Sequence, residues 1–266
     1  MKRENPFKTE AELVEAFIGA ANKNPWRDDN SKWVPYPETC GFDLVMVNDE
    51  SGIQVGIEAK LSLNVKVLCQ AISGVDGWRT QGPDYRAVLV PSAGVQLGLS
   101  GLARRLGLTV LCPYDHGYSS KPNWECRPEL PSERIRTWKV DDDWFPWCPT
   151  ERLKLPDYVP DVQAGKPSPV ALTQWKIQAI KLAILLDRRG HVTRADMKAL
   201  GLSPTFFCGP GGRLVPAHKE GRYQCYTAGR GMLDFKAQHP RNYDEIAADF
   251  DQWGADLMTP HTEKLL

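Results

Sequence analysis

Three charged side chains gather at one end of an otherwise apolar pair of segments. The segment 53–60 ends in Glu58-Ala59-Lys60, and the segment 41–48 carries Asp43 near its start. If the loop between them is symmetric about the 50–51 bond, Asp43 faces Glu58 across a β-hairpin and both carboxylates share one face. Lys60 is expected on that face too, because side chains alternate along a strand.

Two carboxylates placed in this way predict a site for a hard divalent cation. Directly opposed strand positions have Cβ atoms roughly 4.5–5.5 Å apart, which lets two carboxylates share one ion. Oxygen ligands favour Mg²⁺ or Mn²⁺ over zinc, and such an ion can polarise a phosphodiester and lower the pKa of a bound water. Lys60 would then orient the water or stabilise charge on the phosphorus centre. The alternative is a polar sheet edge, where Lys60 forms a surface salt bridge with Glu58 or Asp43.

Asp43 followed by Glu58-Ala59-Lys60 resembles the D…E-x-K signature of the PD-(D/E)XK nuclease superfamily, which has the restriction-endonuclease-like fold. The resemblance extends over residues 8–112, because the expected order of helices and strands also matches. It implies a Mg²⁺-dependent (or Mn²⁺-dependent) endonuclease that hydrolyses DNA. Phe42 stands where the family name has proline, a position that varies in the superfamily.

The resemblance also suggests two further site residues outside the hairpin. Some members place a carboxylate on the first helix, and Glu10 alone of the three glutamates there shares the apolar stripe, which makes it the first choice as a third metal ligand and Glu12 the second. Gln70 matches a glutamine that often lies near the site in related nucleases. The alternatives are a carboxylate that stabilises the start of a helix for Glu10 and an ordinary helix-surface residue for Gln70.

The elements that must position these residues form an α/β pattern. Apolar periodicity predicts helices and strands in an order that fits a mixed sheet flanked by helices: helix 8–22, strands 43–48 and 53–60, helix 63–75, strand 86–90, helix 95–106 and strand 108–112. We therefore expect a nuclease-like domain over residues 1–112. Residues 113–168 are rich in proline and tryptophan and are predicted to be a linker that packs back on the core, or an insertion.

The rest of the chain predicts a smaller α+β domain. Isoleucines at helical spacing predict a helix from Thr173 to Gly190, followed by a variant capping box at Thr193 and a helix start at Ser203. The segments 213–218 and 222–227, joined by 219–221, then predict a hairpin. Three helices and a hairpin resemble a winged-helix domain, assigned to residues 169–242, with an acidic helix and tail over 243–266.

Charge segregation points to a polyanion as the partner of this second domain. Residues 166–242 carry 13 basic and 4 acidic groups, whereas the segments before and after it are acidic. The expected DNA contacts are Arg213, Lys219, Arg222 and Arg230 around the hairpin, because the short helix 204–208 has no arginine or lysine to read base edges. Such domains also serve as protein-interaction modules, which is the alternative for this half.

Composition sets the remaining expectations. The chain has 266 residues, a net charge of zero, no long apolar run and no secretory pattern at its start, so we expect a cytoplasmic protein without membrane contact, and a homodimer is compatible with this class. The seven cysteines form no C-x-x-C pair, which argues against a disulfide framework. A zinc site built from Cys112, His116, Cys126 and Cys148 has irregular spacing and is not favoured. Two rival functions remain open: a catalytically silent DNA-binding or regulatory protein, and a protein-interaction adaptor.

Overall fold

The computed structural model describes residues 5–23, 32–73, 81–115, 122–131, 143–162, 172–209 and 211–258. The chain divides into two compact units. Unit 1 comprises Met1–Leu155 and Val162–Ala171, and unit 2 comprises Pro156–Asp161 and Leu172–Leu266. Each unit has its own hydrophobic core.

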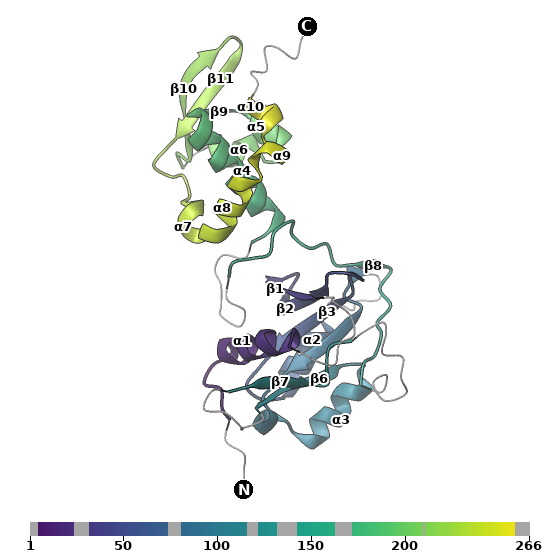
Figure 1. The fold of residues 1–266 in the computed structure, drawn as a ribbon. Helices are drawn as coiled ribbons and strands as arrows, with labels where there is room; N and C mark the ends of the chain where they lie inside the picture. Colours follow the sequence, from purple (N-terminus) through teal and green to yellow (C-terminus); the bar gives the residue numbers. More distant parts are fainter. Residues whose placement is uncertain are drawn as a thin grey trace. The chain divides into compact units, whose positions relative to one another are not determined.

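Unit 1 is built on a six-stranded mixed sheet with strand order β1-β2-β3-β5-β6-β7 (Figure 1). The parallel pairs are β3–β5 and β5–β6, and the outer pairs are antiparallel. Its elements are α1 (Glu10–Ala21), β1 (Trp33–Thr39), β2 (Phe42–Asn48), β3 (Gln54–Ala59), α2 (Val65–Ile72), β4 (Gln81–Gly82), β5 (Tyr85–Leu89), the 3₁₀ turn η1 (Ser92–Gly94), α3 (Leu97–Arg105), β6 (Thr109–Asp115), β7 (Trp124–Arg127) and β8 (Glu151–Arg152).

Helices pack on both faces of this sheet, and alternation along β5 shows how. Ala87 and Leu89 belong to the core cluster that includes the apolar face of α1, whereas Val88 and Val90 belong to the cluster formed with α2 and α3. Successive strand side chains point to opposite faces, so one buried strand supplies both cores. The predicted mixed sheet flanked by helices is confirmed at this level.

Two strands of the sheet were not predicted. β1 is an edge strand that contains Pro35 and Pro37, which an edge tolerates because one side of the strand needs no ladder hydrogen bonds. β7 lies within residues 113–168 and pairs with β6, and Leu130 and Trp144 from the same region are buried in the unit 1 core. These described residues of the region therefore pack on unit 1, whereas Pro156–Asp161 belong to unit 2. The end of the predicted helix 63–75 lies outside the described residues, which show α2 ending at Ile72.

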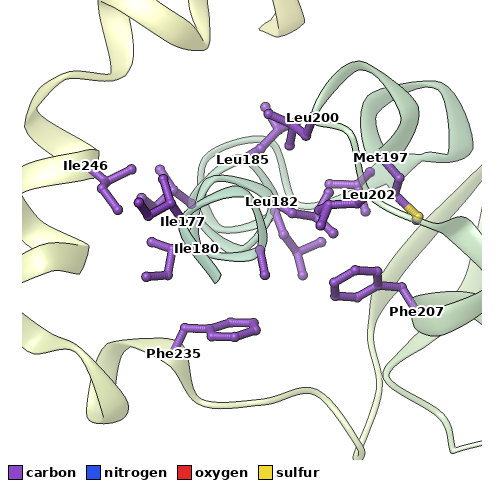
Figure 2. Packing of buried hydrophobic residues seen from close by; sticks show 14 of the residues in the cluster. Ile177, Ile180, Leu182, Leu185, Met197, Leu200, Leu202, Phe207, Phe235 and Ile246 are labelled. Atoms are coloured by element: carbon purple, nitrogen blue, oxygen red, sulfur yellow. The ribbon is translucent and has the colours of Figure 1, made fainter. Parts of the chain in front are cut away.

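Unit 2 surrounds the long helix α4 (Gln174–Arg189), which has Thr173 as its N-cap and Gly190, in the left-handed conformation, as its C-cap. Figure 2 shows Ile177, Ile180, Leu182 and Leu185 radiating from this helix into a core completed by other elements of the unit. Those elements are β9 (Val192–Thr193), α5 (Arg194–Ala199), α6 (Pro204–Cys208), β10 (Leu214–Glu220), β11 (Tyr223–Ala228), α7 (Phe235–Gln238), α8 (Pro240–Ala248), α9 (Phe250–Trp253) and α10 (Ala255–Met258). The three short strands form an antiparallel sheet in the order β10-β11-β9.

The second hairpin differs from its prediction at the turn. The predicted connection 219–221 is wrong, because Lys219 and Glu220 continue β10 and Glu220 pairs with Tyr223. The connection is therefore Gly221-Arg222, and Gly221 has a φ of 55°, which glycine adopts without steric cost. The predicted capping box is confirmed: the Thr193 hydroxyl accepts from the Asp196 N–H while the Asp196 carboxylate accepts from the Thr193 N–H.

Within the described residues, no helix has the length and apolar character needed to cross a membrane.

Candidate active site

The hairpin β2–β3 brings the two predicted carboxylates together. Leu44 pairs with Ile57 and the Asn48 N–H donates to the Ile53 carbonyl, so the register has the symmetry that the loop predicted and contains no bulge between these pairs. The next step outward places Asp43 beside Glu58, close enough for the charge of Asp43 to raise the pKa of Glu58.

Lys60 joins three segments of unit 1 at this point. Its Nζ atom lies 3.1 Å from Asp43 Oδ2 and 3.0 Å from Glu10 Oε2, and it donates to the Ala59 carbonyl at 2.7 Å. The Ala59 N–H donates to the same Asp43 oxygen at 2.9 Å. The resulting cluster, called the carboxylate cluster here, consists of Glu10, Asp43, Glu58 and Lys60.

Glu58 is the buried member of the carboxylate cluster, with 4% of its surface exposed. Burial raises the pKa of Glu58, and the neighbouring charge of Asp43 raises it further; Lys60 opposes them, and the result is a pKa of about 8. Glu38 adds a smaller increase. Glu38 lies on β1, a strand that the sequence did not predict, so its effect on the pKa of Glu58 was not predicted either.

Lys60 stays charged in this setting. Burial lowers the pKa of its ammonium group, but the charge of Asp43 and the hydrogen bonds that Lys60 donates to Glu10 and Asp43 outweigh it, so the pKa lies above the ordinary 10.5. Opposite charges within hydrogen-bond distance favour the charged form. The site therefore holds a permanent cation among three carboxyl groups.

Helix α1 supplies Glu10 through its first turn. Thr9 caps the helix by accepting from the Glu12 N–H, so Glu10 is the first helical residue and reaches Lys60. Glu12 and Glu15 are exposed, and Glu12 instead accepts from the Lys8 N–H at 2.7 Å. The inward direction expected for position 10 is thus the one found.

Phe42, next to Asp43, is seated by a glycine on the neighbouring strand. A Cβ atom on Gly56 would lie 2.7 Å from the Phe42 ring, so the ring occupies the space that any other side chain would need. The Arg86 guanidinium lies 5.4 Å from the centre of the same ring and donates to the Ala71 carbonyl at 2.8 Å. These contacts fix the start of β2 and with it the position of Asp43.

Gln70 is not linked to the carboxylate cluster by any hydrogen bond among the described residues. It lies on α2, and its Oε1 atom is buried without a hydrogen-bond partner there. Its proposed proximity to the reacting groups stays a prediction.

The donor set of the carboxylate cluster suits a hard divalent cation. Asp43 and Glu58 offer only oxygen atoms, and Glu10 can add a third carboxylate. Burial and the charge of Asp43 raise the pKa of Glu58 to about 8, so a second negative charge at this position is unfavourable unless a cation compensates it. Lys60 now neutralises Glu10 and Asp43, so an ion would have to share these carboxylates with the ammonium group.

The expected nucleic-acid residues of unit 2 lie in different environments. Lys219, Arg222 and Arg230 are exposed. Arg213 is half-buried: it donates to the Phe206 carbonyl at 3.1 Å, and its guanidinium lies 4.0 Å from the centre of the Phe206 ring. Arg213 thus fastens the hairpin to α6, and the other three extend toward solvent.

The disfavoured zinc grouping is only partly described. Pro113 of β6 pairs with Cys126 of β7, which brings Cys112 near Cys126, and Cys148 is exposed. His116 lies outside the described residues. Burial raises the pKa of Cys112 to about 11 and that of Cys126 well above its ordinary value, so both remain protonated thiols.

Comparisons of the chain with protein-family models, curated proteins and solved structures found no match.

Proposed function

We propose that the protein is a Mg²⁺-dependent endodeoxyribonuclease of the PD-(D/E)XK type. The observation that carries the proposal is the convergence of Glu10, Asp43, Glu58 and Lys60, which come from a helix and two adjacent strands, at one end of a mixed sheet. The order of α1, hairpin, α2, β5, α3 and β6 agrees with the restriction-endonuclease-like fold that the D…E-x-K pattern suggests.

In this proposal each residue has a separate task. Asp43 and Glu58 hold the metal ion, and Glu10 supports it from α1. Bound Mg²⁺ would polarise the scissile phosphodiester and acidify a water molecule. Lys60, charged and fixed by two carboxylates, orients the attacking water or stabilises negative charge that develops on the phosphate oxygens. The backbone N–H of Ala59 holds the Asp43 carboxylate in place.

Unit 2 is proposed to be a winged-helix-like domain that holds DNA through its backbone. Its helices α4, α5 and α6 precede the hairpin β10–β11, as in that domain type. The exposed Lys219, Arg222 and Arg230 suit phosphate contacts, which position a protein without reading sequence. Limited sequence preference is expected, since α6 has the sequence PTFFC and offers no cationic side chain.

One observation favours a second candidate, a catalytically silent DNA-binding protein on the same fold. Lys60 already pairs with Glu10 and Asp43, and this ion-pair network compensates negative charge in the site without a metal ion. A protein that has lost cleavage would retain such a network as a stabilising feature.

Plasmid nicking by the full-length protein, with Mg²⁺, with Mn²⁺ and in EDTA, separates the two candidates. The nuclease cleaves only with a metal ion, and Asp43→Ala, Glu58→Ala and Lys60→Ala each reduce the rate at least ~10²-fold. Glu15→Gln, an exposed change on α1, is the matched control and leaves the rate unchanged. DNA binding without cleavage in any metal would support the silent protein, and full activity in EDTA would exclude the metal mechanism.

A further inference from the structure

Four side chains of unit 2 place three kinds of metal-binding atom close together. One nitrogen each of His191 and His218, a carboxylate oxygen of Glu220 and the sulfur of Cys225 all lie within 4.8 Å of one another. No other grouping that combines nitrogen, oxygen and sulfur ligands in this way occurs in the ranges that the structure describes. These four residues are called the mixed-donor cluster below.

The small antiparallel sheet brings the mixed-donor cluster together. His218 and Glu220 lie two residues apart on β10, and their side chains approach each other to 3.5 Å. Cys225 on β11 pairs with Thr193 of β9, and His191 precedes that strand by one residue, two positions before Thr193. Strands β10 and β11 and the residue before β9 therefore contribute to one cluster, although its members are spread over the sequence from 191 to 225.

The contacts within the mixed-donor cluster converge on one oxygen. Glu220 Oε1 lies 3.2 Å from His191 Nε2 and 3.5 Å from His218 Nε2. His191 Nε2 is buried and, despite this approach, has no hydrogen-bond partner with suitable geometry among the described residues. A buried imidazole nitrogen without a hydrogen bond is costly unless something else coordinates it. Cys225 is completely buried.

We infer that His191, His218, Glu220 and Cys225 bind a zinc ion. Imidazole nitrogen together with thiolate sulfur selects Zn²⁺ over Mg²⁺, which prefers oxygen. Tetrahedral Zn²⁺ with bonds of about 2.0–2.3 Å needs ligand atoms roughly 3.3–3.8 Å apart, so the cluster must contract by about 1 Å. The exposed side chains of His218 and Glu220 can make that adjustment, with 53% and 46% of their surfaces accessible.

The charge and number of ligands indicate a structural site. One thiolate and one carboxylate balance the two charges of the ion, and four protein ligands leave no open position for a substrate. Coordination would tie the far end of the β10–β11 hairpin to the residue before β9. It would thereby fix the segment that bears Lys219 and Arg222, whether or not unit 1 cleaves DNA.

The test uses the full-length protein stripped with a chelator and dialysed free of it. Titration with Zn²⁺ against a chromophoric competitor should show one tight site per chain, and Co²⁺ should give the visible bands of a tetrahedral ion with a thiolate-to-cobalt charge-transfer band. Cys225→Ser should remove the charge-transfer band. His218→Ala and Glu220→Gln should weaken Zn²⁺ binding at least ~100-fold, the upper end of what second-shell changes alone cost.

Two controls keep the result specific. Cys208→Ser changes another thiol of unit 2 and Glu58→Gln changes the carboxylate cluster, and both should retain the Zn²⁺ affinity. Because His218 is exposed, its variant gives a decisive answer even if Cys225→Ser does not fold. The inference is overturned if the protein takes up no Zn²⁺ or if His218→Ala binds it as tightly as the parent. A failed cleavage assay leaves it unaffected.

Discussion

Replacing Glu58 by glutamine should change how the stability of unit 1 depends on pH. Glu58 is buried beside Asp43, and its pKa in the folded protein is about 8, compared with an ordinary value of 4.5. Glutamine has nearly the same shape, cannot ionise and can still donate a hydrogen bond to Asp43. The substitution therefore removes the titration while retaining the packing.

The direction of this pH dependence follows from whether the folded or the unfolded chain binds the proton of Glu58 more tightly. Between the unfolded pKa of 4.5 and the folded pKa of about 8, the folded chain keeps a proton on Glu58 that the unfolded chain has released. The free energy of unfolding must then fall as pH rises through this window. At 1.36 kcal/mol for each pKa unit, the loss is on the order of 5 kcal/mol, complete only above pH 8.

Hydrogen exchange read by mass spectrometry measures this loss for unit 1 separately from unit 2. Peptides from β2 and β3, corrected for the intrinsic pH dependence of exchange, should lose protection from pH 5 to pH 9 in metal-free buffer. With Glu58→Gln, the protection of these peptides should hardly depend on pH, and the variant should be more stable than the parent at pH 9. Glu15→Gln should behave like the parent. A parent protein with a flat profile, or a Glu58→Gln protein with the parent's slope, would refute the reasoning.

Four other substitutions test separate parts of the structure. Gly56→Ala should destabilise unit 1 by about 1–3 kcal/mol because its Cβ meets an aromatic ring, whereas Gly19→Ala, in an open helical position, should stabilise by up to about 1 kcal/mol in urea unfolding. Asp196→Asn should cost unit 2 about 3 kcal/mol by breaking the buried pair with Arg189. Although burial opposes it, Arg189 holds the pKa of Asp196 below the ordinary 3.8, so this difference should be present above pH 4 and disappear on acidification, as followed by circular dichroism. Lys219→Ala should lower the slope of log affinity for DNA against log salt by about one, measured by fluorescence anisotropy.

The geometry of the carboxylate cluster could be predicted because it depends on local rules. A hairpin register follows from the position of its turn, and the pairing of Leu44 with Ile57 is the one that symmetry about the 50–51 bond requires. The direction of Glu10 followed from the apolar stripe of α1. In both cases the regular repeat of side-chain directions along a strand or helix determines where a side chain points over a few residues.

The parts that could not be predicted depend on contacts between distant segments. β1 contains two prolines and was not recognised, because only its place at the sheet edge makes them acceptable. β7 forms through pairing with β6, and the sequence around it has little periodicity. The mixed-donor cluster combines residues of the β10–β11 hairpin with His191, which precedes β9, and has no regular ligand spacing. The pairing of β9 with β11 that brings them together was not predicted from the sequence.

The two proposed metal sites differ in their ligand atoms, and this difference predicts separate responses to chelators. The carboxylate cluster offers oxygen alone, whereas the mixed-donor cluster offers nitrogen and sulfur as well. Phenanthroline, a nitrogen chelator that binds Zn²⁺ far more tightly than Mg²⁺, should remove only the zinc ion. Loosening of the hairpin should then speed hydrogen exchange in β10 and β11 and weaken DNA binding, while cleavage at saturating DNA in excess Mg²⁺ continues. EDTA in excess should remove both metal ions, so that cleavage stops and the hairpin loosens. If phenanthroline abolished cleavage at saturating DNA, the ion that supports cleavage would be a nitrogen-binding metal rather than Mg²⁺, and the assignment of the carboxylate cluster to Mg²⁺ would be wrong.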